Sequence, residues 1–259
     1  GDAAGHAPGL RSAALWHHRG ESSLQPLRLR GSMAALVQQI WRGALALISA
    51  PRCPVCAAAL LDPPRVESMA LETALFCGEC AQQLALPQGG LQGDVPLLWC
   101  AAAPYDGALR RLLLRQRPRP EPPVIAALAA VLHRSCSTVL PGALLVPIPS
   151  WKRRGNPLPQ LVAQELARRA GASTAVLPQL LQRHRPTLGQ HHLSRSLRQR
   201  NLQGAFACGP AQGSRPLWLV DDILTTGSTA AAAAAALQAG GHAVQGVLTL
   251  ARTPARRRL

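Results

Sequence analysis

The sequence predicts an α/β protein with a mostly parallel sheet, preceded by a small module held by cysteines. Residues 217 to 229, LWLVDDILTTGST, place an apolar run, two aspartates and a Gly/Thr turn in the order strand, acidic tip and helix start. Two C-x2-C pairs, CPVC and CGEC, stand upstream. With 259 residues, 47% of them apolar, the chain suffices for one substantial core and one small appendage.

The N-terminal part divides into two segments. Residues 1 to 32 mix Gly, Ser, Pro and Arg without periodicity, and we expect a disordered extension there. Residues 33 to 86 are expected to hold an amphipathic helix, at residues 33 to 50, and then the cysteine module. Polar residues interrupt that helix and no run of eighteen apolar residues exists, so we expect neither a signal peptide nor a membrane span. A cytoplasmic location follows as an expectation.

The four cysteines of the two pairs are Cys53, Cys56, Cys77 and Cys80, with twenty residues between the pairs. Each pair can place two thiolates on one tight turn, and two such turns close a tetrahedral Zn²⁺ shell. Four cysteines leave no open position, so the zinc is expected to be structural. A redox pair and an iron–sulfur cluster are the alternatives.

The main domain is expected over residues 95 to 252, after a Gly-rich linker. Apolar runs alternate in it with helical patterns, which favours a parallel sheet. Strands are expected at residues 97 to 103, 143 to 148, 174 to 177, 217 to 220 and 244 to 250, and helices at residues 108 to 117, 124 to 133, 158 to 169 and 230 to 238.

The turn after the apolar run at residues 217 to 220 carries the candidate site. At the carboxyl end of a parallel strand, backbone N–H groups and the start of the next helix suit a phosphate. Asp221 and Asp222 are suited to sugar hydroxyls and to a hydrated Mg²⁺. The alternative is a turn whose hydroxyls only cap a helix. The proposed phosphate cradle comprises Thr225, Thr226, Gly227, Ser228 and Thr229.

Positive charge is concentrated in the C-terminal part of the chain. The net charge is +16, and residues 122 to 259 hold 16 Lys and Arg against 3 acids, two of which are Asp221 and Asp222. Such a field attracts polyanions, whether a phosphorylated sugar, a nucleotide or nucleic acid. A GC-biased composition explains the arginine content equally well.

The segment LWLVDDILTTGST resembles the phosphoribosyl pyrophosphate (PRPP) signature of type I phosphoribosyltransferases at all thirteen positions. Together with the cysteine module, it makes the chain similar to ComF-like proteins over about residues 50 to 252. The resemblance implies a type I phosphoribosyltransferase-like sheet, PRPP with Mg²⁺ as ligand, and catalytic positions at Asp221, Asp222 and Arg198. It also implies a role in natural transformation, with single-stranded DNA and the DNA-uptake machinery as partners.

Three further segments occupy family-like positions. Arg117 ends a basic helix, at a position where Lys is usual in the family, and is a candidate for binding pyrophosphate. Lys152, Arg153 and Arg154 lie in the loop expected to receive pyrophosphate, although RGNPLPQ departs there from the family's wording. Residues 181 to 206 resemble the hood that closes over PRPP. The alternative for Arg117 is a solvent-facing helix face, and that for the expected pyrophosphate loop is a solvated turn. The alternative for residues 181 to 206 is an exposed basic loop that binds nucleic acid or nothing.

Two functions from different classes follow. The chain is a PRPP-binding protein that transfers a phosphoribosyl group with release of pyrophosphate, or a non-catalytic module that binds single-stranded DNA and senses PRPP or does not use it. Few aromatic side chains are available for base stacking, with 3 Phe and Tyr and 5 Trp. The sequence names no acceptor and sets no oligomeric state.

Overall fold

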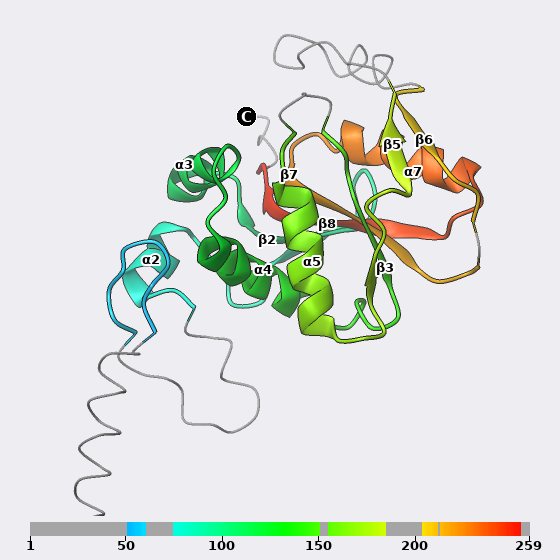
Figure 1. Cartoon of the computed structure of the whole chain (residues 1–259). Coiled ribbons are helices and arrows are strands. Elements are labelled where there is room, and N and C mark those ends of the chain that lie inside the picture. Colours follow the sequence, from blue (N-terminus) through cyan, green and yellow to red (C-terminus); the bar gives the residue numbers. More distant parts are fainter. Residues whose placement is uncertain (1–50, 61–74, 151–154, 185–203, 212, 255–259) are drawn as a thin grey trace, which may run out of the picture. The chain divides into compact units, whose positions relative to one another are not determined.

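A computed structural model describes residues 51–60, 75–150, 155–184, 204–211 and 213–254. The predicted extension at residues 1 to 32 and the amphipathic helix at residues 33 to 50 lie outside this part of the chain. Within it, the secondary structure alternates as expected, and Figure 1 shows the helices packed around a central sheet.

The main sheet has six strands in the order β1-β2-β8-β7-β3-β4. Its strands are β1 (Leu91–Gly93), β2 (Trp99–Pro104), β3 (Leu144–Pro147), β4 (Ala175–Val176), β7 (Leu217–Leu224) and β8 (Val244–Arg252). All neighbouring strands pair in parallel except β1 and β2, which are antiparallel. The prediction of a mixed α/β fold with a mostly parallel sheet is confirmed.

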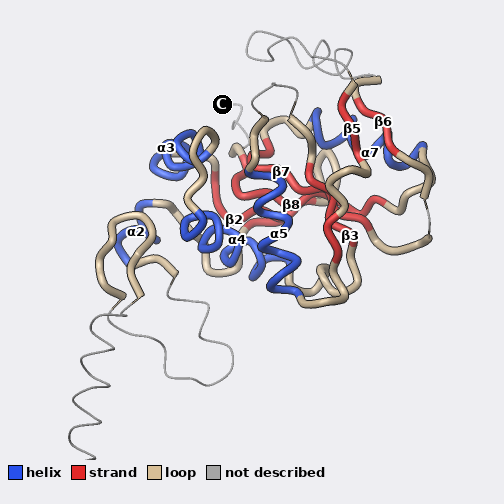
Figure 2. Tube along the Cα trace, viewed as in Figure 1, coloured by secondary structure: helices blue, strands red, loops and turns tan. Residues whose placement is uncertain are grey.

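Helices cover both faces of the sheet, as Figure 2 shows. On one face lie α3 (Gly107–Gln116), α4 (Pro122–Cys136) and α5 (Leu158–Ala170), which share a core with Trp218, Val220 and Leu248. On the other face, α7 (Ser228–Ala239) packs with Leu217, Leu219 and Val247. Because successive residues of β7 alternate between these two cores, its apolar run is buried on both sides.

A short strand occupies the segment where the sequence predicts a linker. Leu91–Gly93 form β1, which pairs with the outer edge of β2. The side chain of Trp99 covers Gly93 so closely that a Cβ at residue 93 would lie 2.5 Å from the ring. Glycine therefore occurs in this strand because it leaves room for the Trp99 ring. Composition alone wrongly indicated a linker for this segment.

The cysteine module precedes the sheet and includes α2 (Gly78–Gln83). Its first pair lies in a turn closed by hydrogen bonds between Cys53 and Ala58 and between Ala57 and Cys53. Its second pair begins α2, where the Cys77 sulfur accepts a hydrogen bond from the Cys80 N–H at 3.4 Å. Cys53 and Cys80 are buried in the same core as α3 and α4.

None of the helices in the described segments combines the length and the apolar character that crossing a membrane requires.

Candidate functional site

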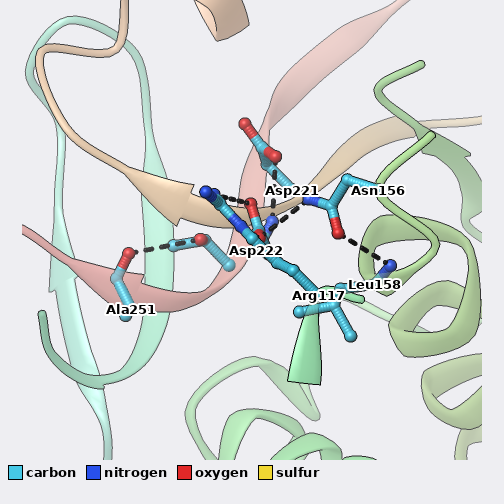
Figure 3. A network of polar contacts seen from close by, with 7 residues as sticks. Arg117, Asn156, Leu158, Asp221, Asp222 and Ala251 are labelled. Atoms are coloured by element: carbon cyan, nitrogen blue, oxygen red, sulfur yellow. Dashed lines mark hydrogen bonds and ion pairs between the residues drawn. The ribbon is translucent and has the colours of Figure 1, made fainter. Parts of the chain in front are cut away.

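The acidic pair lies within β7, near its carboxyl end. The sequence predicts that the strand stops at Val220, but pairing with β8 continues through Asp221 opposite Thr249 and on to Leu224 opposite Arg252. Since side chains of a strand alternate between its faces, the two neighbouring aspartates point to opposite sides of the sheet. Figure 3 shows their carboxylates diverging.

Asp222 is buried, with 2% of its surface exposed, and it is held by three hydrogen bonds. Arg117, directly after α3, donates from Nε to Oδ2 at 2.6 Å and from Nη2 to Oδ1 at 3.1 Å. Asn156, just before α5, donates to Oδ2 at 2.8 Å and accepts from the Leu158 N–H at 3.2 Å. A paired guanidinium and an amide thus satisfy the charge of Asp222 inside the protein.

The chain segment that carries Arg117 is held in place by hydrogen bonds of its own. Gln116 is buried, and its side chain donates to the Glu121 carboxylate at 2.9 Å and accepts from the Glu121 N–H at 2.7 Å. These two bonds close the turn between α3 and α4 and so fix the point from which Arg117 reaches Asp222. Sequence reasoning considered Arg117 for pyrophosphate; its contact with Asp222 could not be read from two positions 105 residues apart.

Asp221 is half-buried on the other face, and its Oδ1 accepts the Asp222 N–H at 2.9 Å. Burial, and then the charge of Asp222, raise the pKa of Asp221 well above its usual value. Arg183 lies near enough for the charge of Asp221 to act on it, and burial lowers the pKa of that guanidinium. A half-buried acid with a perturbed pKa is typical of a functional site.

The turn between β7 and α7 is the segment in which the sequence predicts the phosphate cradle. Gly227 adopts a left-handed conformation with φ of 76°, and α7 begins at the next residue without a side-chain cap. The hydroxyls of Thr226 and Ser228 lie 2.9 Å apart. The Thr226 hydroxyl also accepts the Ser228 N–H, at 3.4 Å. The first N–H groups of a helix have no partner within the helix, so a helix start of this kind favours an anion.

Two residues that sequence reasoning missed hold this turn. The Arg252 guanidinium, at the end of β8, donates to the carbonyls of Leu224, at 3.0 Å, and of Thr225, and it lies 5.3 Å from the centre of the Trp99 ring. Pro96 packs against Gly227 so closely that a Cβ there would lie 2.5 Å from its ring. Neither residue carries a signal in sequence, because their contacts join three separate segments.

The ends of the predicted hood form a two-stranded antiparallel ribbon. Its strands are β5 (Leu181–Arg183) and β6 (Phe206–Cys208), and Arg183 lies 5.1 Å from the centre of the Phe206 ring. Arg198, with the rest of the hood, lies outside the described residues, as do Lys152, Arg153 and Arg154 of the expected pyrophosphate loop. Their roles stay predictions.

The four cysteines of the two pairs come together as predicted. The sulfur atoms of Cys53, Cys56, Cys77 and Cys80 all lie within 4.8 Å of one another. Tetrahedral Zn²⁺ with Zn–S bonds of about 2.3 Å places its sulfurs roughly 3.8 Å apart, so the cluster fits this ion. Burial raises the pKa of Cys53, but hydrogen bonds from the backbone, chiefly that of Cys77, outweigh it and lower the pKa to about 6.

These features define a class: an α/β protein with an acidic pair and a Gly/Thr/Ser turn at the carboxyl end of a central parallel strand, preceded by a four-cysteine module fit for zinc. No family model matches the chain. It is 33% identical over 220 residues to the DNA utilization protein YhgH of Salmonella typhimurium, covering 78% of this chain and 90% of that protein. It is 32% identical, with the same coverage, to the DNA utilization protein YhgH of Escherichia coli strain K12. The chain belongs to the family of the DNA utilization protein YhgH.

Proposed function

We propose that this protein acts in the use of DNA and binds a 5′-phosphorylated ribose, PRPP as expected from the ComF-like resemblance, at the carboxyl end of β7. The first part of the proposal rests on the names of its relatives. The second rests on one observation above all: the left-handed glycine turn that begins α7 follows directly on a strand that presents a half-buried acid.

The roles divide along β7. Thr225 to Thr229 would receive the 5′-phosphate through N–H groups and hydroxyls. Asp221 is the acid that we assign to the ribose hydroxyls and to a hydrated Mg²⁺, because three hydrogen bonds from other side chains engage the Asp222 carboxylate. Asp222 would reach the ligand only if Arg117 released it, so we assign to it the positioning of the strand.

Transfer of the phosphoribosyl group is the reaction that this arrangement would support. The pyrophosphate would leave the anomeric carbon, and an acceptor would add to the resulting cationic sugar. The acceptor is unnamed, and sensing of PRPP without transfer is the second function that the same site would serve in a DNA-use protein.

Calorimetric titration of the full chain with Mg-PRPP tests the ligand. We expect saturable binding by the wild type. Ser228→Asp places a negative charge at the start of α7 and should weaken binding by roughly 100-fold, since repulsion replaces attraction at the phosphate. Ser173→Asp is the matched control, because Ser173 accepts a hydrogen bond from Gly142 at the other end of the sheet, as a carboxylate also would. Absence of binding by the wild type, or equal binding by all three proteins, excludes the proposed ligand site. Release of pyrophosphate in the presence of different bases then separates transfer from sensing.

A further inference from the structure

A group of exposed arginines lies along α3 and the turn that follows it. Its members are Arg110, Arg111, Arg115 and Arg119. The acids closest to them in sequence have other partners: Asp106 caps α3 by accepting the Gly107 N–H at 2.7 Å, and Glu121 bonds to Gln116. Glu79 of α2, which packs next to α3, accepts a hydrogen bond from Gln83 at 3.2 Å. Among the described residues, the positive charge of this surface is therefore available to an anion from outside.

Two of these arginines border a cavity of about 280 Å³ between α3 and the cysteine module. Leu84 and Leu112 are buried at its base, and the exposed side chains of Gln83, Arg111 and Arg115 lie around it. The remaining lining residues are Val55, Cys80 and Ala108. Because Arg111 and Arg115 are one helical turn apart, their side chains lie on the same face of α3.

Apolar side chains flanked by guanidinium groups match the chemistry of an unstacked nucleotide. A nucleobase buries its ring faces against aliphatic carbons or guanidinium planes, and the adjoining phosphates bind arginine. Pockets for drug-sized ligands begin at about 300 Å³, so this cavity has room for a single base but not for a whole extended ligand. A duplex keeps its bases stacked, so a single strand is the form that fits.

We propose that the cavity between α3 and the cysteine module binds single-stranded DNA, one base entering the cavity while neighbouring phosphates bind Arg111 and Arg115. The inference rests on the proposed role in DNA use and gives that role a site separate from the turn at Gly227. It also gives the cysteine module a function beyond stability, since Val55 and Gln83 of the module form one wall of the site.

Fluorescence anisotropy of a labelled twenty-residue oligodeoxythymidine, titrated with the full chain at several salt concentrations, tests the proposal. The double variant Arg111→Ala and Arg115→Ala should bind at least about tenfold more weakly, and the slope of log K against log salt should fall by about 1.4, the value for two phosphate contacts on a single strand. The matched control is the double variant Arg110→Ala and Arg119→Ala, which removes the same charge from the same surface but no residue of the cavity. The DNA affinity of this control should fall by less than about threefold.

A second comparison tests entry of the base. The wild type should bind the oligodeoxythymidine more tightly than an abasic strand of equal length. Ala108→Phe, which projects a ring into the cavity, should remove this preference and leave binding of the abasic strand unchanged. Zinc content and thermal unfolding establish that the variant is folded; should it not fold, the abasic comparison on the wild type still decides.

The outcomes separate this inference from the proposed function. Equal losses of DNA affinity in the two double arginine variants overturn the cavity site and leave the role in DNA use standing. The same holds if the wild type does not prefer the oligodeoxythymidine to the abasic strand. Failure of the wild type to bind any strand overturns the cavity site and direct contact with DNA together. Tighter binding of oligouridine overturns the assignment to DNA. Mg-PRPP binding by the Arg111 and Arg115 variant should equal that of the wild type, because these residues lie outside the turn at Gly227.

Discussion

Two adjacent aspartates of identical chemistry have different environments in this protein. Asp222 points into the layer of α3 and α5, where Arg117 and Asn156 neutralise and orient it. Asp221 points the other way, beside the charges of Asp222 and Arg183, and its pKa is raised well above its usual value. The alternation of a β-strand is the cause, because it directs neighbouring side chains to different surroundings.

This difference predicts a pH dependence of stability. In the unfolded chain an aspartate ionises near pH 3.9, whereas the raised pKa of Asp221 delays ionisation in the folded protein. As the pH rises from about 4 to that raised pKa, the unfolded state alone loses its proton, so wild-type stability should decrease through this window. Asp221→Asn lacks the titrating group and should gain in unfolding free energy relative to the wild type as pH rises.

Urea denaturation between pH 4 and pH 8 measures this relative gain, which amounts to about 1.4 kcal/mol for each unit by which the pKa is raised. Asp94→Asn removes an equivalent charge from an exposed position and serves as the control. A difference between Asp221→Asn and the wild type that stays constant over the whole range contradicts the prediction.

At the scale of elements, the turn between β7 and α7 is fixed by segments on either side of it in the sheet. Pro96 from the β1–β2 connection packs on Gly227, and Arg252 from β8 binds the carbonyls at the end of β7. The left-handed Gly227 then begins α7 without a side-chain cap. The cradle is thus shaped by its neighbours as well as by its own residues.

Two glycines with nearly the same backbone conformation allow this support to be tested. Gly227 has φ of 76° and Gly142 has φ of 75°, but a Cβ at residue 142 meets no atom within 4 Å. Gly142→Ala should cost about 1–2 kcal/mol of unfolding free energy, the price of a left-handed alanine. Gly227→Ala should cost roughly 2–5 kcal/mol, because its Cβ also collides with Pro96.

Chemical denaturation gives both values, and titration with Mg-PRPP gives a second readout. Only Gly227→Ala is expected to weaken ligand binding, since only its turn belongs to the proposed cradle. Equal costs for the two substitutions would show that Pro96 yields easily and that the turn is not held in the way we infer.

For the molecule as a whole, the cysteine module and the sheet share one core. Phe76, Cys80 and Leu84 of the module are buried in the same cluster as Leu109 and Leu128 of α3 and α4. If the cluster holds zinc, loss of the ion would therefore remove packing from the main domain, because a cluster of thiols without its ion repacks or opens.

Chelation of zinc should lower the melting temperature by about 5 °C or more, since a structural metal adds its binding free energy to folding. Metal analysis of the purified chain is expected to find one zinc per molecule, and Cys56→Ala should lose it. Cys208→Ala, which alters a cysteine outside the cluster, should retain it. Iron in place of zinc, or a melting temperature that chelation leaves unchanged, contradicts a structural zinc site.

Sequence patterns predicted the parallel sheet because each of its buried strands is a local feature. The continuous apolar run at Leu217 to Val220 indicated a strand covered on both sides, and the two C-x2-C pairs indicated a cluster whatever lay between them. The end of β7 and the existence of β1 escaped prediction. Both depend on backbone pairing with a partner strand, which adds hydrogen bonds to residues whose side chains give no sign of it.

The amino-acid order alone determined the α/β class, the cysteine quartet and the succession of apolar strand, acidic pair and Gly/Thr turn, because composition, periodicity and spacing report on groups close together in the chain. Only the tertiary structure decided which aspartate is neutralised, what supports Gly227, and that α3 and the cysteine module enclose a cavity. These contacts join residues far apart in sequence. They form because packing of the sheet and its helices brings such residues together, and no local sequence pattern predicts these contacts.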